Sequence, residues 1–264
     1  MGTNYTLITG ASQGFGKAMA LECANRELNL VLVSLPHSGL KELSNFINQN
    51  YNVDVHSIEV DLSLNDSCYK IAEYINDNNI QIKYLVNNAG LLSRGFFEDL
   101  DDRFIVKQIQ VNITAPTLLI NLLLKNLKKN KPSGILNISS MAGFFALPKK
   151  QVYGGTKAYL ISFSNSLRKE FRKDDISVTT ICPGGLNTNT RLCYQNRIVG
   201  MITRESTLNP ESAARIAINS MLKRKKTIIP GFVNKCFMIL DKLLPEFIKD
   251  ILTNKEINKF PVEV

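Results

Sequence analysis

A glycine-rich segment between an apolar run and a helical pattern constrains the fold of this chain more than any other feature. Residues 5–8 form the apolar run, residues 9–16 read TGASQGFG, and helical periodicity follows. Gly10 permits a tight turn, Gly14 lets the backbone approach a pyrophosphate, and Gly16 lets the helix pack closely on the strand. Because a helix N-terminus favours the negative charge of phosphate, this segment predicts a dinucleotide site.

Strand-like and helix-like patterns alternate along the rest of the chain. Further strands are predicted at residues 30–33, 53–60, 83–86, 135–138, 177–181 and 226–230. Helices are predicted at residues 39–50, 63–75, 102–129 and 151–173, and from Pro210 after an Asn209 N-cap; Ser63 or Asn65 should cap the second of these. The alternation predicts an α/β fold, a single-domain Rossmann-type doubly wound parallel sheet of about seven strands. Ligands of such sheets bind beyond the carboxyl ends of the strands.

Tyr153 and Lys157 are candidate catalytic residues because they stand four residues apart in a predicted helix. Both side chains then lie on one face, and a cation beside a phenol lowers the pKa of the phenol. This makes Tyr153 a candidate proton donor or acceptor. Ser140 follows an apolar strand and could bond the same substrate oxygen. The alternative is a surface tyrosine and lysine on an ordinary amphipathic helix, since a lone YxxxK pattern is common.

The end of the second strand bears on the choice between NAD and NADP. Residues 34–37 read SLPH, so no carboxylate is present to bind a ribose 2′-hydroxyl or to repel a 2′-phosphate. No arginine is present either, although His37, Ser38 and Lys41 could help to hold a phosphate. A simple turn before the next helix is the alternative. NADP(H) is therefore the favoured cofactor and NAD(H) the alternative.

Composition narrows the function classes. A chain of 264 residues suits one α/β domain, or two small ones. Its net charge of +9 is dispersed along the sequence, which argues against a nucleic-acid partner. Five cysteines without paired spacing fit a reducing compartment, so a cytoplasmic location is expected. With two histidines, a histidine-based triad or a zinc site is poorly supported, and no metal is expected. No leader pattern or long apolar run is apparent.

Taken together, these motifs resemble the short-chain dehydrogenase/reductase family in its single-domain branch, over about residues 3–231. The resemblance rests on TGASQGFG at 9–16, NNAG at 87–90, Asn112, Ser140, YGGTK at 153–157 and PGGLNT at 183–188. It implies that Tyr153 is the general acid or base and that Ser140 orients the substrate carbonyl. It also implies that Lys157 binds the nicotinamide ribose and that Asn112 supports a water-linked proton relay. A buried, structural asparagine is the alternative for Asn112.

The same resemblance and the predicted crevice define the expected cofactor contacts. These are Gly10, Ser12, Gln13, Gly14, Phe15, Gly16, Ser34, His37, Asp61, Leu62, Asn88, Ala89, Gly90, Tyr153, Lys157, Pro183, Gly184, Leu186 and Thr188. The pattern departs at Leu35, where family members often carry an aspartate for NAD or an arginine for NADP. Gln13 also lacks the basic side chain that many NADP-preferring members have.

Residues 232–264 are expected to form an amphipathic helical extension of the domain formed by residues 1–231. Apolar residues recur there at helical spacing, and Pro245 should divide them into two helices. The extension suits an added packing layer, a lid over the substrate, a peripheral contact with a membrane surface, or a dimer contact. An apolar extension beside the site favours a steroid-like, lipid-like or bulky ketone substrate.

The predicted function is hydride transfer between a nicotinamide and a carbonyl or alcohol carbon. The alternative within the enzyme class is a 3-oxoacyl-carrier-protein reductase. The alternatives from other classes are a non-catalytic dinucleotide-binding sensor or scaffold, and a membrane- or nucleic-acid-associated binder. The family resemblance also implies a homodimer or homotetramer.

Overall fold

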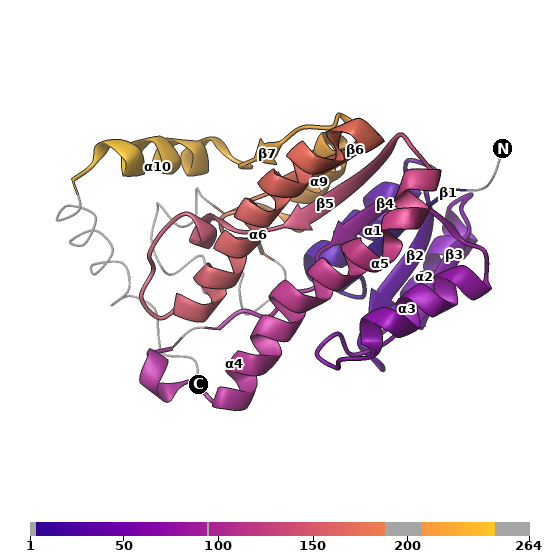
Figure 1. The fold of residues 1–264 in the computed structure, drawn as a ribbon, viewed down its shortest axis with the longest axis horizontal. Coiled ribbons are helices and arrows are strands. Elements are labelled where there is room, and N and C mark those ends of the chain that lie inside the picture. Colours follow the sequence, from indigo (N-terminus) through magenta and orange to yellow (C-terminus); the bar gives the residue numbers. More distant parts are fainter. Residues whose placement is uncertain (1–3, 94, 188–206, 246–264) are drawn as a thin grey trace.

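A single parallel sheet of seven strands organises the protein in the computed structural model, which describes residues 4–93, 95–187 and 207–245 (Figure 1). The strand order is β3-β2-β1-β4-β5-β6-β7, and every pairing is parallel. The strands are β1 (Asn4–Thr9), β2 (Asn29–Ser34), β3 (Val55–Glu59), β4 (Gln81–Asn87), β5 (Ser133–Ile138), β6 (Ile176–Ile181) and β7 (Thr227–Ile228). The predicted Rossmann-type sheet is confirmed.

The strand order places a crevice between β1 and β4. Strands β2 and β3 are added in sequence on one side of β1. The chain then crosses to the other side of β1, where β4, β5, β6 and β7 are added in sequence. Connections therefore leave in opposite directions at the carboxyl ends of β1 and β4, which is where open sheets of this kind bind ligands. The glycine-rich segment follows β1, and the NNAG segment spans the end of β4.

Helices cover both faces of the sheet, which explains why its central strands are apolar on both sides. The helices are α1 (Gly14–Ala24), α2 (Leu40–Asn50), α3 (Ser67–Asp77), α4 (Asp102–Ile109), α5 (Ala115–Lys129), α6 (Gln151–Glu170), α9 (Pro210–Leu222) and α10 (Phe232–Leu243). Leu7 belongs to the core cluster that contains residues of α3, α5 and α6, whereas its neighbour Ile8 belongs to the cluster that contains residues of α1, α2 and α9.

The predicted helical stretch over residues 102–129 is confirmed, but a π-helical turn interrupts its α-helical geometry. Helix α4 ends at Ile109, a π-helical turn covers Gln110–Thr114, and α5 begins at Ala115. Pro116 lies in the first turn of α5, where its missing N–H costs little because first-turn donors have no partner within the helix. The wider turn holds Asn112 inward, and this residue is only 1% exposed. Single π-turns inside helices frequently mark functional sites.

The predicted N-cap of the helix after β3 is wrong. This helix begins at Ser67, with Asp66 in the capping position, rather than after Ser63 or Asn65. Ser63 is instead held in a turn, because both its backbone N–H and its hydroxyl donate to Asp61 Oδ1. The predicted start of α9 is confirmed, since Asn209 has extended backbone and Pro210 is the first helical residue.

The last described helix, α10, runs outward from β7, away from the sheet (Figure 1). Phe232, Ile239 and Leu240 on this helix are 81%, 61% and 47% exposed. The helix that was predicted to follow Pro245 lies outside the described residues, as does most of the predicted substrate loop at 196–207. Within the described ranges, no helix combines the length and the apolar character needed to cross a membrane.

Candidate active site

The glycine-rich turn after β1 brings bare backbone to the edge of the crevice. Gly10 and Gly14 have φ values of +65° and +52°, a region that favours glycine. At Gly16 a Cβ atom would collide with the carbonyl oxygen of Gly10 and would lie 2.6 Å from Asn88 Nδ2. No acidic residue occupies the first turn of α1. The helix N-terminus is therefore open to an anion.

Asn88 fastens this turn to the end of β4. Its side-chain amide donates to the carbonyl oxygens of Thr9 (2.9 Å) and Gly10 (3.1 Å). In return, Thr9 Oγ1 accepts from the backbone N–H groups of Asn88 (3.0 Å) and Ala89 (3.1 Å). The NNAG segment is thus part of the scaffold that shapes the glycine-rich turn, and it is more than a simple connection.

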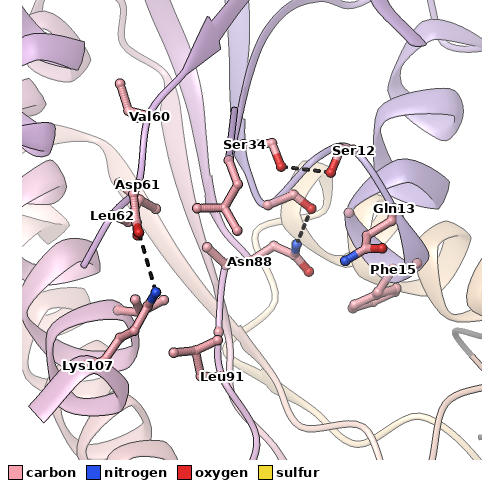
Figure 2. A pocket seen from close by; sticks show the side chains of 17 residues that line it. Ser12, Gln13, Phe15, Ser34, Val60, Asp61, Leu62, Asn88, Leu91 and Lys107 are labelled. Atoms are coloured by element: carbon pink, nitrogen blue, oxygen red, sulfur yellow. Dashed lines mark hydrogen bonds and ion pairs between the residues drawn. The ribbon is translucent and has the colours of Figure 1, made fainter. Parts of the chain in front are cut away.

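A cavity of about 380 Å³ lies in front of this turn (Figure 2). In the figure, Gln13 and Phe15 lie on one side, Asp61 and Lys107 face each other on the other side, and Asn88 lies between them. The lining residues are Gly10, Ser12, Gln13, Gly14, Phe15, Gly16, Ser34, Leu35, Val60, Asp61, Leu62, Asn88, Ala89, Gly90, Leu91, Lys107 and Val111.

Polar groups from three strand ends meet at the β2–β3 side of the cavity. The hydroxyls of Ser12 and Ser34 lie 2.7 Å apart. Asp61 Oδ2 lies 3.4 Å from Lys107 Nζ. Burial opposes ionisation of Asp61, but the hydrogen bonds from Ser63 and the charge of Lys107 outweigh it and lower the pKa of this carboxyl. Asp61 is therefore an ionised, fixed acceptor at neutral pH.

Helix α6 carries Tyr153 and Lys157 one turn apart, as predicted from their spacing. Lys157 Nζ lies 5.7 Å from the centroid of the Tyr153 ring and donates to the carbonyl oxygen of Ile138 at 2.8 Å. The side chain is almost fully buried, and burial lowers the pKa of its ammonium from 10.5 to about 8. A carbonyl acceptor at the end of β5 thus holds this lysine in place beneath Tyr153.

Ser140 begins a tight turn that packs directly on α6. Ser140 Oγ accepts from the backbone N–H of Ala142 at 3.1 Å. A Cβ atom at Gly143 would lie 2.8 Å from the carbonyl carbon of Lys157, and one at Gly154 would lie 3.0 Å from Ala142 O. Two glycines, one on each segment, therefore permit the close approach that puts Ser140 beside the start of α6.

Asn112 connects the loop after β4 to α6. Its Oδ1 atom accepts from the Leu91 backbone N–H (2.8 Å), and its Nδ2 atom donates to Leu91 O (3.0 Å) and to Thr156 Oγ1 (3.0 Å). Thr156 in turn donates to the carbonyl oxygen of Tyr153 at 2.7 Å. This network ties the π-helical turn to the helix that carries the candidate catalytic pair.

Gly90 is the point where the cavity and the candidate catalytic residues meet. It lines the cavity, and a Cβ atom there would lie 3.3 Å from both Asn112 Oδ1 and Lys157 Nζ. The side chains of Asn112 and Lys157 therefore face the same point of the cavity wall.

The structure brings most of the predicted cofactor contacts together, but not all of them. Twelve line the cavity: Gly10, Ser12, Gln13, Gly14, Phe15, Gly16, Ser34, Asp61, Leu62, Asn88, Ala89 and Gly90. His37 is exposed, has a φ of +56° and does not line the cavity. Pro183, Gly184 and Leu186 follow β6, where Pro183 O accepts from the N–H of Met141. Thr188 lies outside the described residues.

Four lining residues were missed by sequence reasoning, namely Val60, Leu91, Lys107 and Val111. Three of them adjoin predicted site residues in the sequence, and that adjacency was an available signal. Lys107 is one helical turn before Val111, so both side chains lie on one face of α4 and its π-helical continuation. The ion pair with Asp61, which follows β3, joins Lys107 to the cavity wall.

The residues present fit a nicotinamide dinucleotide. Bare glycine backbone and an uncharged helix N-terminus suit a pyrophosphate. Apolar walls with a few fixed polar groups suit the adenosine half, and Lys157 Nζ lies beside Gly90, which lines the cavity. Tyr153, Lys157, Gly90 and the glycine-rich turn would hold the cofactor, which would supply the redox chemistry when bound.

The burial of Lys157 predicts a specific dependence of stability on pH. Between pH 8 and 10.5 the unfolded chain still binds a proton that the folded chain has released, so the free energy of unfolding rises with pH. Relative to Lys157→Met, the wild-type protein should gain about 2 to 3 kcal/mol between pH 7 and 10. Chemical denaturation of both proteins across this range measures the difference. A constant difference would contradict the buried ammonium.

Comparison with known proteins places the chain in a family. A family model described as short chain dehydrogenase matches residues 4–196. A very-long-chain 3-oxoacyl-CoA reductase of Rattus norvegicus is 35% identical over 183 residues, which are 68% of this chain and 58% of that protein. A hydroxysteroid dehydrogenase-like protein 1 of Gallus gallus is 30% identical over 250 residues, covering 92% of this chain and 73% of that protein.

Solved structures agree with this comparison. A short-chain dehydrogenase from Sphingobium yanoikuyae in complex with NADPH matches with a TM-score of 0.78 and 26% identity, covering 91% of this chain and 93% of the other. A bulky-bulky ketone specific alcohol dehydrogenase from Comamonas testosteroni matches with a TM-score of 0.77 and 25% identity, covering 90% and 91%. The chain spans less than two thirds of the length of the very-long-chain 3-oxoacyl-CoA reductases that it matches.

Proposed function

Because this chain belongs to the short-chain dehydrogenase family, we propose that it is an oxidoreductase that transfers hydride between a nicotinamide cofactor and the carbonyl or alcohol carbon of a hydrophobic substrate. The observation that carries the proposal is that the cavity and the candidate catalytic residues adjoin each other at Gly90. A glycine-lined cavity that fits a dinucleotide includes Gly90, and Asn112 and Lys157 both face this residue. A binding module has no need of a buried ammonium beside a tyrosine at that end.

Tyr153 transfers the proton in this proposal. In the direction of reduction, its hydroxyl gives a proton to the substrate oxygen, and in oxidation its phenolate takes that proton back. Ser140 donates a hydrogen bond to the same oxygen. Lys157 contributes a nearby positive charge that favours the phenolate, and it is held by Ile138 O so that its position does not depend on the substrate.

Asn112 completes the proton path through its carbonyl oxygen. Both of its amide hydrogens are committed to Leu91 and Thr156, so Nδ2 has no donor left for a water molecule. Oδ1 accepts one hydrogen bond from Leu91 and retains capacity for a second, on the side where Lys157 Nζ approaches Gly90. A water between Oδ1 and Nζ would return a proton to Lys157 after each turnover.

NADP(H) is the cofactor that this site favours, with NAD(H) as the alternative. The end of β2 carries Ser34 and Leu35, and no carboxylate is placed there to repel a 2′-phosphate. Ser12 and Ser34 present two adjacent hydroxyls to the cavity. Lys41, which the sequence suggested for the phosphate, lies 3.5 Å from the carboxylate of Glu59 instead.

Introducing a carboxylate at Leu35 should reverse this preference. Leu35→Asp is expected to raise the Kd for NADPH by about tenfold or more relative to the Kd for NADH, through repulsion of the 2′-phosphate. Leu64→Asp is the matched control, because Leu64 is similarly exposed (55% against 49%) and does not line the cavity. Fluorescence titration with both cofactors measures the ratio. An unchanged ratio in Leu35→Asp would place the phosphate elsewhere.

The substrate proposed is a lipid-like, steroid-like or bulky ketone, or the corresponding alcohol. Exposed apolar side chains follow β4 at Leu92, Phe96 and Phe97. Similar proteins carry names that specify 3-oxoacyl-CoA, hydroxysteroid and bulky ketone substrates. A 3-oxoacyl thioester on a carrier protein is the alternative, and a basic protein with a net charge of +9 suits an acidic carrier.

Assembly and location extend the proposal. We propose a homodimer or homotetramer, which would cover apolar side chains such as Val106 and Ile109 on α4.

The described cysteines Cys23, Cys68, Cys182 and Cys236 are free, which supports the cytoplasm as the compartment. Residues 1–231 would form the catalytic unit, and the extension from Phe232 would supply apolar surface for a peripheral membrane contact.

The test of the proposed function is a titration of the pure protein with NADPH and NADH, followed by turnover assays. The ketone panel should include steroid ketones, bulky aryl ketones, and 3-oxoacyl thioesters on both coenzyme A and carrier protein. Tight NADPH binding with turnover of a hydrophobic ketone is the expected result. Tight binding without turnover across the panel would favour the non-catalytic sensor, and preference for the carrier-linked thioester would favour the alternative reductase.

A further inference from the structure

Asn234 is a buried polar side chain in the first turn of α10, the helix that runs outward from β7 (Figure 1). Only 3% of this residue is exposed, and it is the one buried residue among residues 232–240, the part of α10 whose burial is described. Its Nδ2 atom donates to the carbonyl oxygen of Pro230 at 2.8 Å. Because the carboxamide is both buried and hydrogen-bonded, it offers a fixed surface to the segment that packs on it.

Two glycines from different segments make room for this carboxamide. Gly231, directly before α10, has a φ of +87°, and a Cβ atom there would lie 3.1 Å from Asn234 Nδ2. A Cβ atom at Gly184 would lie 2.6 Å from Asn234 Oδ1, 2.8 Å from Nδ2 and 3.0 Å from Cγ. The carboxamide therefore packs directly on the backbone of Gly184, which belongs to the loop after β6.

The same loop and the end of β6 hold the segment that carries Ser140. Pro183 O, in the loop, accepts from the backbone N–H of Met141 at 2.9 Å. Ile181 O, at the end of β6, accepts from the backbone N–H of Ser139 at 2.8 Å. Ser140 lies between these two donors, so the loop and β6 together determine where its backbone lies.

We propose that Asn234 is a positioning residue that fixes Ser140 through the loop after β6. Without the carboxamide, the space beside Gly184 is empty and the loop can shift into it. Such a shift loosens the hydrogen bond between Pro183 and Met141, and the Ser140 hydroxyl loses its single orientation toward the substrate oxygen. The inference rests on the proposed function, which gives Ser140 its role, and it extends the catalytic unit beyond residues 1–231 into α10.

Amide hydrogen exchange tests this coupling without any turnover. In Asn234→Ala, exchange of the Met141 amide should accelerate about tenfold or more, because its bond to Pro183 O opens more often. The Leu30 amide, which donates to Asp54 O on the other side of β1, should keep its wild-type rate. An unchanged rate at Met141, or equal acceleration at both amides, would overturn the proposal.

Gly184→Ala is the reciprocal variant. Its methyl group would collide with the carboxamide of Asn234, so exchange of the Met141 amide should accelerate here too. Adding Asn234→Ala should bring the rate back toward the wild-type value, because the smaller side chain leaves room for the methyl group. Accelerations that simply add in the double variant would contradict a direct contact between the two residues.

Turnover then shows whether the coupling reaches the chemistry. With the preferred ketone, Asn234→Ala should lower kcat/KM about tenfold, since small displacements of positioning groups are costly. In a Ser140→Ala background the same substitution should lower kcat/KM less than about twofold, because the hydroxyl that it positions is already absent. An equal loss in both backgrounds would mean a general structural role and would overturn the proposal.

Asn126→Ala is the matched control. Asn126 also ties two segments together, since its carboxamide bonds Ile80 O at 2.9 Å and the Ile82 N–H at 2.7 Å, but it does so at the amino end of β4. Its loss should leave kcat/KM and the Met141 exchange rate within about twofold of wild type. Faster Met141 exchange in Asn234→Ala, in a protein whose wild type turns over no ketone, would support the contact and contradict only the proposed function.

Discussion

Replacing Tyr153 by phenylalanine is expected to lower kcat by about 10²- to 10⁴-fold, the range typical of a lost general acid or base. The ring remains, so its packing beside Lys157 is kept and the Kd for NADPH should change little. Steady-state assays with the preferred ketone and a fluorescence titration of NADPH provide the two readouts. The combination separates the loss of a proton donor from a general loss of structure.

Tyr159→Phe is the control for this substitution. Tyr159 lies on the same helix, its hydroxyl is 3.0 Å from Thr117 Oγ1, and its ring stacks on Phe163. Loss of that hydrogen bond should cost about 1 kcal/mol of stability and leave kcat close to the wild-type value. Comparable activity of Tyr153→Phe and Tyr159→Phe would remove Tyr153 from the mechanism.

Replacing Gly16 by alanine should abolish cofactor binding. The new methyl group would collide with Gly10 O and lie 2.6 Å from Asn88 Nδ2, the amide that fastens the turn. The neighbouring atoms are backbone and a side chain held by two hydrogen bonds, so they cannot move aside cheaply. A destabilisation of about 1 to 3 kcal/mol is expected, together with loss of measurable NADPH affinity. Thermal unfolding and fluorescence titration measure the two effects.

Gly155→Ala tests whether the effect is specific to the turn. A Cβ atom at Gly155 in α6 would meet nothing within 4 Å, so alanine should stabilise the helix by roughly 0.5 to 1 kcal/mol. NADPH affinity should be unchanged. If Gly16→Ala behaved like Gly155→Ala, the glycine-rich turn would have room that the structure does not show, and its place in the cofactor site would be lost.

The sequence was sufficient for the parts of the protein that local patterns determine. Apolar runs located the central strands, because strands covered on both faces are apolar throughout, and alternation located β3, which is only partly buried. Local backbone geometry could be predicted from the glycines at 10, 14 and 16 and from the spacing of Tyr153 and Lys157. These features were predictable because each involves only residues that are close together in the sequence.

The sequence was insufficient where distant segments meet. Residues 102–129 were correctly predicted as helical, but nothing in their sequence pattern indicated the π-helical turn at Gln110–Thr114. In the sequence Lys107 is an ordinary surface lysine, and only the structure pairs it with Asp61 at the cavity. His37 follows β2 in sequence, yet it does not line the cavity, although Leu35 of the same turn does.

The central claim is hydride transfer, and the most direct test follows the hydrogen itself. NADPH deuterated at the transferable position would be incubated with the protein and the panel of hydrophobic ketones, and the alcohols would be analysed by mass spectrometry. The predicted result is deuterium on the carbinol carbon with the wild type, and almost none with Tyr153→Phe. Tight binding of NADPH with no label in any product would contradict the account.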